Sequence, residues 1–113
     1  GTVIICSKKI TLGENIMLGR NIMIYDSDHH QIVDRNGYMI NRDAEVIIED
    51  HVWLTSNVTV LRGVTIGEGS IITSQTVINE DLPPHSLVSG SSSVKVTDIK
   101  HIAGWSREST YQY

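Results

Sequence analysis

The chain has 113 residues, which is the length of one domain and too short for a two-domain enzyme with a separate cofactor fold. Apolar residues make up 40% of it and charged residues 19%, which excludes a disordered or collagen-like chain. Nine basic and thirteen acidic side chains give a net charge of −4 without a Lys/Arg cluster, so we expect no nucleic-acid partner.

Cellular location is indicated by three features of the sequence. No apolar stretch approaches the ~20 residues that span a bilayer, and no signal-peptide pattern opens the chain. The single cysteine, Cys6, follows Ile4 and Ile5, which predicts a buried thiol in a reducing compartment. We therefore expect a cytoplasmic protein without a membrane span, and the start at Gly1 suggests part of a longer chain.

Apolar side chains recur at every sixth residue, over about residues 4–24 and again, in the same phase, over about residues 46–82. The first class of positions is Cys6, Leu12, Leu18, Ile24, Ile48, Leu54, Val60, Ile66, Ile72 and Ile78. Four residues after these lies a second, mostly small or β-branched class: Ile10, Ile16, Ile22, Val52, Val58, Val64, Ser70, Thr76 and Leu82. A helix requires a period of 3.6 and a half-buried strand requires alternation, so neither explains the pattern. A period of six predicts an all-β solenoid of triangular turns, each ~4.8 Å above the last.

Glycine follows the first-class residue at Gly13, Gly19 and Gly67. We expect these glycines at tight corners, where the backbone adopts a conformation that a Cβ would resist.

Residues 25–45 interrupt the pattern without changing its phase, and they are polar and turn-rich. Such a segment predicts a loop extruded at one corner of the solenoid. Binding chemistry concentrates on loops that a rigid scaffold positions, so we place the functional site here.

Residues 83–113 form the expected closing segment. Pro83 and Pro84 cannot donate to a strand ladder, so they end the repeat. A turn at Gly90–Ser93, a short strand over Val94–Ile99, a helical turn near Ile102–Arg107 and a loose end should follow.

Three stretches of the chain carry a resemblance to the hexapeptide-repeat acyltransferases, in particular to the sugar and polysaccharide O-acetyltransferases. They are residues 46–54 (VIIEDHVWL), residues 63–67 (GVTIG), and residues 81–84 (DLPP) with the later Gly90. The resemblance covers roughly residues 10 to 100. It implies a left-handed parallel β-helix, a homotrimer, and an acyl-coenzyme A donor bound between subunits. Handedness comes from the resemblance alone, because parallel crossovers are right-handed in almost all folds.

The segment Ser27-Asp28-His29-His30-Gln31-Ile32 is similar to the family's Ser-Asp-x-His-x-Ile, which puts a general-base role on His30. A hydroxyl is a poor nucleophile until a base removes its proton, and histidine suits that task near neutral pH. Asp28 could orient the His30 imidazole as a dyad, or it could form a turn with its own backbone. His29 should point to the opposite face, as a structural residue or a substrate contact. Acetyl-CoA is the expected donor, without a metal, and Cys6 is not expected to be a nucleophile.

Other positions are candidates for binding. Trp53 should face outward, against a sugar acceptor, the loop or another subunit. Ser56 and Ser74 match family positions that contact the pantetheine arm, and Lys95 is a candidate phosphate contact.

The closing segment departs from the family. Residues 90–95 (GSSSVK) replace Gly-Asn-Pro-Ala-Lys-Val, and Thr55, Thr73 and residues 79–80 (NE) replace Gly, Gly and Thr-Lys. A lysine is lost and a glutamate gained near an anionic cofactor, which weakens the electrostatic case for binding. Lys95, Lys100 and Arg107 compensate only if this segment folds back over the groove.

Two alternatives to acyl transfer remain open. A non-catalytic trimeric scaffold or binding module is consistent with the altered closing segment. A zinc enzyme of the β-helix carbonic anhydrase type would use His29, His30 and His51, although adjacent histidines diverge and rarely bind one ion.

Overall fold

The computed structural model describes residues 1–89, 95–98 and 104–106. These residues form short strands joined by turns, and no helix among them could cross a membrane. The strands are β1 (Thr2–Ile5), β2 (Ile10–Leu12), β3 (Met17–Arg20), β4 (Ile22–Tyr25), β5 (Val46–Ile48), β6 (Trp53–Ser56), β7 (Thr59–Val60), β8 (Thr65–Ile66), β9 (Ile71–Ile72), β10 (Val77–Ile78), β11 (Ser86–Ser89) and β12 (Lys95–Asp98).

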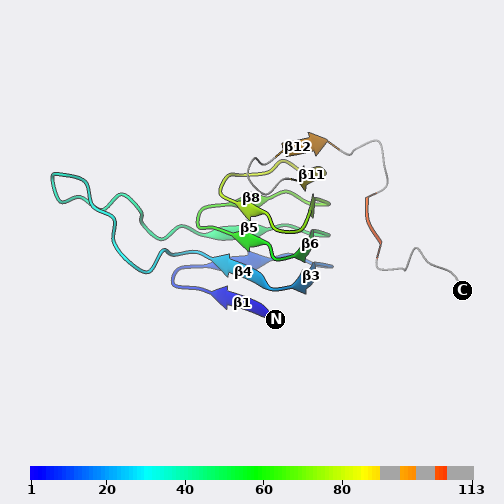
Figure 1. The fold of residues 1–113 in the computed structure, drawn as a ribbon, viewed down its shortest axis with the longest axis horizontal. Coiled ribbons are helices and arrows are strands. Elements are labelled where there is room, and N and C mark those ends of the chain that lie inside the picture. The colour runs from blue at the N-terminus through cyan, green and yellow to red at the C-terminus, as the bar shows by residue number, and fades with distance from the viewer. Residues whose placement is uncertain (90–94, 99–103, 107–113) are drawn as a thin grey trace, which may run out of the picture.

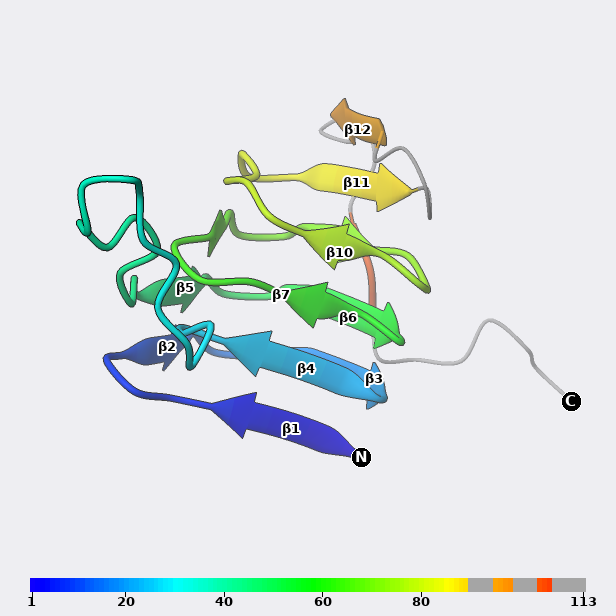
Figure 2. The same cartoon turned by 60° about the vertical axis from the view of Figure 1, so that its left-hand side comes forward.

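Three sheets enclose the core as the faces of a prism (Figure 1). The first sheet has the order β1-β4-β7-β10, the second β2-β5-β8, and the third β3-β6-β9-β11-β12. All pairs are parallel except β11 with β12. Figure 2 shows the first sheet with its strands stacked one above another. We call the turns from the first to the second sheet the first corner, those from the second to the third sheet the second corner, and those back to the first sheet the third corner.

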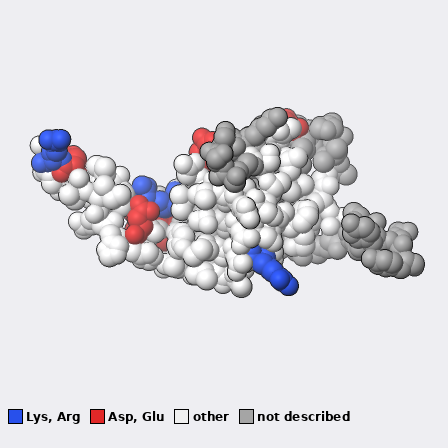
Figure 3. Space-filling view, in the orientation of Figure 1, with Lys and Arg blue, Asp and Glu red and all other residues white. Residues whose placement is uncertain are grey.

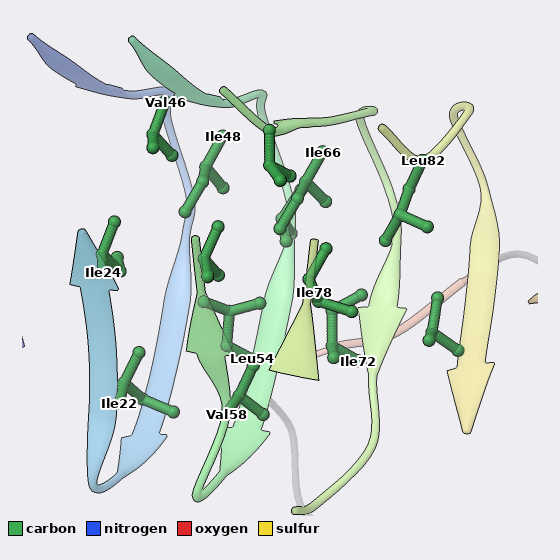
Figure 4. Close-up of a cluster of buried hydrophobic side chains, with 14 residues drawn as sticks. Ile22, Ile24, Val46, Ile48, Leu54, Val58, Ile66, Ile72, Ile78 and Leu82 are labelled. Atoms are coloured by element: carbon green, nitrogen blue, oxygen red, sulfur yellow. The ribbon is translucent and has the colours of Figure 1, made fainter. Parts of the chain in front are cut away.

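The register of the sheets confirms the period of six. Residues in equivalent places on successive turns pair side by side, in three ladders that point into the prism. They are Ile4-Ile24-Val60-Ile78, Leu12-Ile48-Ile66-Leu82 and Leu18-Leu54-Ile72-Val88. Most of these side chains are fully buried and interlock between neighbouring turns (Figure 4). Each such burial contributes about 1.5–3 kcal/mol, so contacts between adjacent turns stabilise the stack.

The prediction was wrong in phase at the two ends of the solenoid. Ile4, not Cys6, pairs with Ile24, so the first turn holds two extra residues and Cys6 is exposed. Ile4 is itself 44% exposed, because no described strand covers the outer edge of β1. Leu82 bridges to Ile66 and so belongs to the first class of positions, which makes the last turn two residues shorter.

The three glycines expected at tight corners are needed for a different physical reason. Gly13, Gly19 and Gly67 do not have positive φ, but a Cβ on each would overlap the backbone of a neighbouring turn. At Gly19 the overlap is with the carbonyl oxygen of Thr55. The left-handed conformation instead recurs at other corner residues: Asn15, His51, Gly69 and His85 at the second corner, Asn21, Asn57 and Gln75 at the third, and Gly63 at the first.

The chain leaves the stack after β4 and rejoins it at β5, so residues 26–45 project from the first corner (Figure 1). The two ends of this loop are joined, because the Ala44 N–H donates to the Asp26 carbonyl over 3.0 Å. Its outer part is a small hairpin in which Val33 bridges Met39 and the Asp34 side chain accepts the N–H groups of two turn residues. The loop therefore begins and ends at one point of the scaffold.

The closing segment is described in part. β12 lies within the strand expected over residues 94–99 and pairs with β11. The turn expected at residues 90–93 and the end of the chain lie outside the described residues. Residues 104–106 do not form a helix, and Trp105 is buried against the second corner.

Candidate active site

The loop starts from Asp26, a carboxylate that is fully buried at the first corner. It accepts the backbone N–H groups of Ser7, Lys8 and Lys9 at 2.7, 2.6 and 2.6 Å. Burial opposes its ionisation, but these hydrogen bonds outweigh burial and lower the pKa of Asp26. The extra residues of the first turn thus wrap around a negative charge.

Cys6 lies beside this carboxylate, and its Sγ donates to Asp26 over 3.5 Å. Partial desolvation, followed by the hydrogen bond and the negative charge of Asp26, raises the pKa of the Cys6 thiol. The thiol is exposed rather than buried as expected, and a raised pKa favours its protonated form over the nucleophilic thiolate.

The two histidines follow directly. The His29 N–H donates to the buried Ser27 hydroxyl over 3.0 Å, and His29 has a φ of 66°. This left-handed conformation is uncommon for a residue with a Cβ, and it turns the chain sharply between His29 and His30. Both imidazoles are exposed.

The described hydrogen bonds of Asp28 join it to residues other than His30, so the dyad that its spacing suggested stays a prediction. The Asp28 Oδ2 accepts the Asn41 Nδ2 at 2.9 Å and the Arg62 Nε at 3.0 Å, and no described hydrogen bond joins it to His30. The hydrogen bond from Asn41, then the guanidinium of Arg62, lower the pKa of Asp28. Asp28 therefore fixes the loop to the third turn of the solenoid.

Asn41 is the residue that the sequence reasoning missed. It is 5% exposed and lies on the returning limb of the loop. Its amide contacts the Asp28 side chain and the backbone at His30 and Ile32. Neither Asn41 nor Arg62 stands out in the sequence, because both act through partners 9 to 34 positions away.

A pocket of about 530 Å³ lies between the loop and the first corner, and both imidazoles line it. Its other lining residues are Ser7, Lys8, Ser27, Gln31, Met39, Asn41, Arg42 and Asp43. Charged groups of both signs gather on the projecting loop, while the adjoining face of the stack is mostly uncharged (Figure 3). An imidazole in this pocket can accept a proton from a bound hydroxyl.

The remaining predicted contacts lie elsewhere on the chain. Trp53 starts β6 at the second corner, half-buried, with its ring 6.0 Å from that of Trp105. Ser56 and Ser74 lie at the third corner, where the Ser74 and Thr55 hydroxyls are 3.2 Å apart. Lys95 starts β12, opposite Ser89. One chain therefore distributes the predicted site over three corners.

His51, a residue of the zinc alternative, pairs with Trp105. The rings stack at 4.2 Å and 5°, the His51 Nε2–H donates to the Trp105 carbonyl over 2.9 Å, and the indole N–H donates to the His51 carbonyl over 2.8 Å. His51 thus lies at the second corner, whereas the loop histidines lie at the first. Within residues 1–89, 95–98 and 104–106 of one chain, no three His, Cys, Asp or Glu side chains are grouped so as to hold a metal ion.

Comparison with known proteins identifies the repeat. Residues 45–80 match the bacterial transferase hexapeptide (six repeats) family. The chain is similar to the galactoside O-acetyltransferase of Escherichia coli (strain K12), with 30% identity over 83 residues that make up 72% of this chain and 40% of that protein.

Solved structures extend the likeness to the fold. Polysialic acid O-acetyltransferase OatWY has a TM-score of 0.86 at 32% identity, covering 99% of this chain and 53% of that chain. The hexapeptide-repeat acetyltransferase VCA0836 of Vibrio cholerae O1 biovar eltor, in complex with acetyl coenzyme A, has a TM-score of 0.70 at 29% identity, covering 84% and 51%. The chain thus spans about half the length of the relatives it matches.

These neighbours are left-handed β-helices, so the expected fold class is confirmed, including the hand that periodicity alone left open. The stacked hexads and the match to the repeat family together show that the chain belongs to the hexapeptide-repeat transferases.

Proposed function

We propose that the protein transfers an acetyl group from acetyl-CoA to a hydroxyl of a sugar or polysaccharide precursor, with His30 as general base. The observation that carries the proposal is the pocket that two exposed imidazoles line, on a loop that polar contacts of the buried Asn41 hold. The acetyltransferases that the chain resembles, one of them in complex with acetyl coenzyme A, support the donor, and the sugar acceptors in their names support the acceptor class.

The chemistry requires one base and no covalent enzyme intermediate. His30 takes the proton of the acceptor hydroxyl as its oxygen attacks the thioester carbonyl. The carbon–sulfur bond then breaks, which leaves the acetyl group on the acceptor oxygen as an ester. The CoA thiolate receives the proton from His30. We assign the base to His30 because it occupies the histidine of the Ser-Asp-x-His-x-Ile pattern. His29 lines the same pocket and is proposed as an acceptor contact.

A complete site requires more than one copy of the chain. Trp53, Ser56 and Ser74 lie at corners other than the one that carries His30. Packing of subunits around a three-fold axis would bring different corners together, so we propose a homotrimer with acetyl-CoA bound between copies. Trp53 then contacts the acceptor of a neighbouring subunit, and Ser56, Ser74 and Lys95 contact the donor.

A matched pair of variants tests the base. Asparagine already occupies left-handed corners in this chain at Asn15, Asn21 and Asn57, so His29→Asn removes an imidazole without straining the backbone. We expect His30→Asn to lower kcat by about 100-fold or more and His29→Asn to lower it by less than about 10-fold. Acetyl transfer to a panel of galactosides and sialic acid oligomers, followed by mass spectrometry, measures both. The reverse order of losses would move the base to His29.

Acetyl-CoA binding separates an enzyme from a scaffold. Calorimetric titration of the wild-type protein and of His30→Asn should give equal dissociation constants, because the base does not hold the donor. Absence of binding to the wild-type protein would favour the non-catalytic scaffold.

A further inference from the structure

Asn41 contacts three points of the segment that carries the histidines. Its Oδ1 accepts the Ile32 N–H at 2.6 Å, and its Nδ2 donates to the His30 carbonyl and to the Asp28 Oδ2, both at 2.9 Å. The amide acceptor and both amide donors are therefore used, in a side chain that is only 5% exposed.

The two backbone contacts fix the peptide groups on either side of Gln31. A carbonyl at one residue and an N–H two residues later is the pair that a neighbouring strand would engage, so the Asn41 amide replaces a strand that the loop does not have. The Ile40 N–H donates to the Ile32 carbonyl over 2.8 Å and extends this pairing. The His30 main chain is thereby held, although the loop around it is exposed.

The third contact connects this arrangement to the solenoid. Asp28 accepts Asn41 on the same oxygen that accepts the Arg62 Nε, and Arg62 follows β7 on the next turn of the stack. The ion pair is partly exposed, so by itself it contributes little to stability. Its geometric effect is to fix one end of the segment 28–32 to the first corner of the next turn of the stack.

We infer that Asn41 is a positioning residue for acyl transfer: its amide sets the backbone of His30, and Asp28 with Arg62 sets Asn41. This inference rests on the proposed function of His30. A base displaced by about 1 Å loses about 100-fold in rate, so an amide whose hydrogen-bonding groups are all used within the protein can control turnover through the backbone that it holds. Asn41 should not affect the affinity for acetyl-CoA, because the groups that hold acetyl-CoA are proposed at other corners.

The test uses the isosteric change Asn41→Asp. The new carboxylate keeps the acceptor for the Ile32 N–H, but it loses both donors and places a like charge against Asp28. Asn36→Asp is the matched control, because Asn36 is exposed at the tip of the same loop and only its backbone N–H has a described bond.

We expect Asn41→Asp to lower kcat by about 100-fold, with the KM for acetyl-CoA changed less than about two-fold, whereas Asn36→Asp leaves both near wild type. Hydrogen exchange, which does not depend on activity, should show faster exchange over residues 28–32 in Asn41→Asp only. Loss of kcat with unchanged exchange, or faster exchange with unchanged kcat, would overturn the inference, as would equal behaviour of the two variants.

The proposed function is judged separately on the wild-type protein and His30→Asn. If the wild-type protein transfers no acetyl group, the proposed function fails. The structural part of the inference is then decided by hydrogen exchange alone: faster exchange over residues 28–32 supports the Asn41 contacts, and unchanged exchange refutes them.

Discussion

Asp26 is a fully buried carboxylate whose negative charge is matched by backbone rather than by a basic side chain. Asparagine would offer one acceptor oxygen to three consecutive N–H groups that the carboxylate now accepts, and a lost hydrogen bond to a charged group costs about 1.5–3 kcal/mol. We expect Asp26→Asn to lower the free energy of unfolding by about 2 kcal/mol at neutral pH in urea titrations. Asp43→Asn, on the exposed part of the loop, is the control and should change it little.

Lowering the pH should reduce the difference in unfolding free energy between the wild-type protein and Asp26→Asn. The folded pKa of Asp26 lies below its ordinary 3.8, so its charge stabilises the fold fully above the unfolded pKa, and this contribution is lost as the pH falls through the folded pKa. The gap in unfolding free energy between the wild-type protein and Asp26→Asn should therefore be constant from about pH 5 to 7 and narrow below about pH 4. A gap that widened in acid would contradict this assignment.

Local residue patterns predicted His29 and His30 but not the side chains that hold them. The histidines are adjacent in an unusual polar segment, and a resemblance identifies that segment directly. Asn41 and Arg62 acquire their roles only when the loop returns and the next turn is laid on the stack, so no local pattern marks them. The described partners of Asp28 also come from distant parts of the chain, so its spacing from His30 did not reveal them.

The strands and corners were predictable wherever a turn has neighbours on both sides. Residues 46–78 keep a strict period of six, and their ladders are as expected. The phase changes at the two ends. Two extra residues at the first turn bring N–H groups to Asp26, and the last turn is two residues shorter where the chain reaches Pro83 and Pro84. The spacing of apolar residues does not predict these changes, because they depend on hydrogen bonds and on proline, which the spacing does not describe.

A substitution at Gly19 tests whether the close approach of β3 and β6 is needed for stability. A Cβ there would overlap the Thr55 carbonyl oxygen in the neighbouring strand, so Gly19→Ala must push β3 away from β6. We expect a loss of at least 1–3 kcal/mol in the free energy of unfolding, measured by thermal and urea denaturation. Gly37→Ala provides the contrast, because Gly37 has a φ of 86° with open space around it, and it should strain only the loop tip.

For the assembled protein, we predict three copies in solution. Sedimentation equilibrium should give three times the chain mass, and acetyl transfer should decline on dilution as the copies separate. The reason is that His30, Trp53 and Ser74 occupy three different corners of one prism. A fully active monomer would contradict both the trimer and the shared site.

The strand pairing of the solenoid does not depend on the length of the loop, which has a consequence for how such proteins evolve. Because the Ala44 N–H meets the Asp26 carbonyl, the excursion opens and closes at a single point, and Ile24 still pairs with Val60 as though the intervening residues were missing. Lengthening such an excursion costs little entropy once its ends are fixed. Loops of another length or sequence could therefore replace residues 26–45, over evolution or by protein engineering, without changes in the strand pairing of the solenoid.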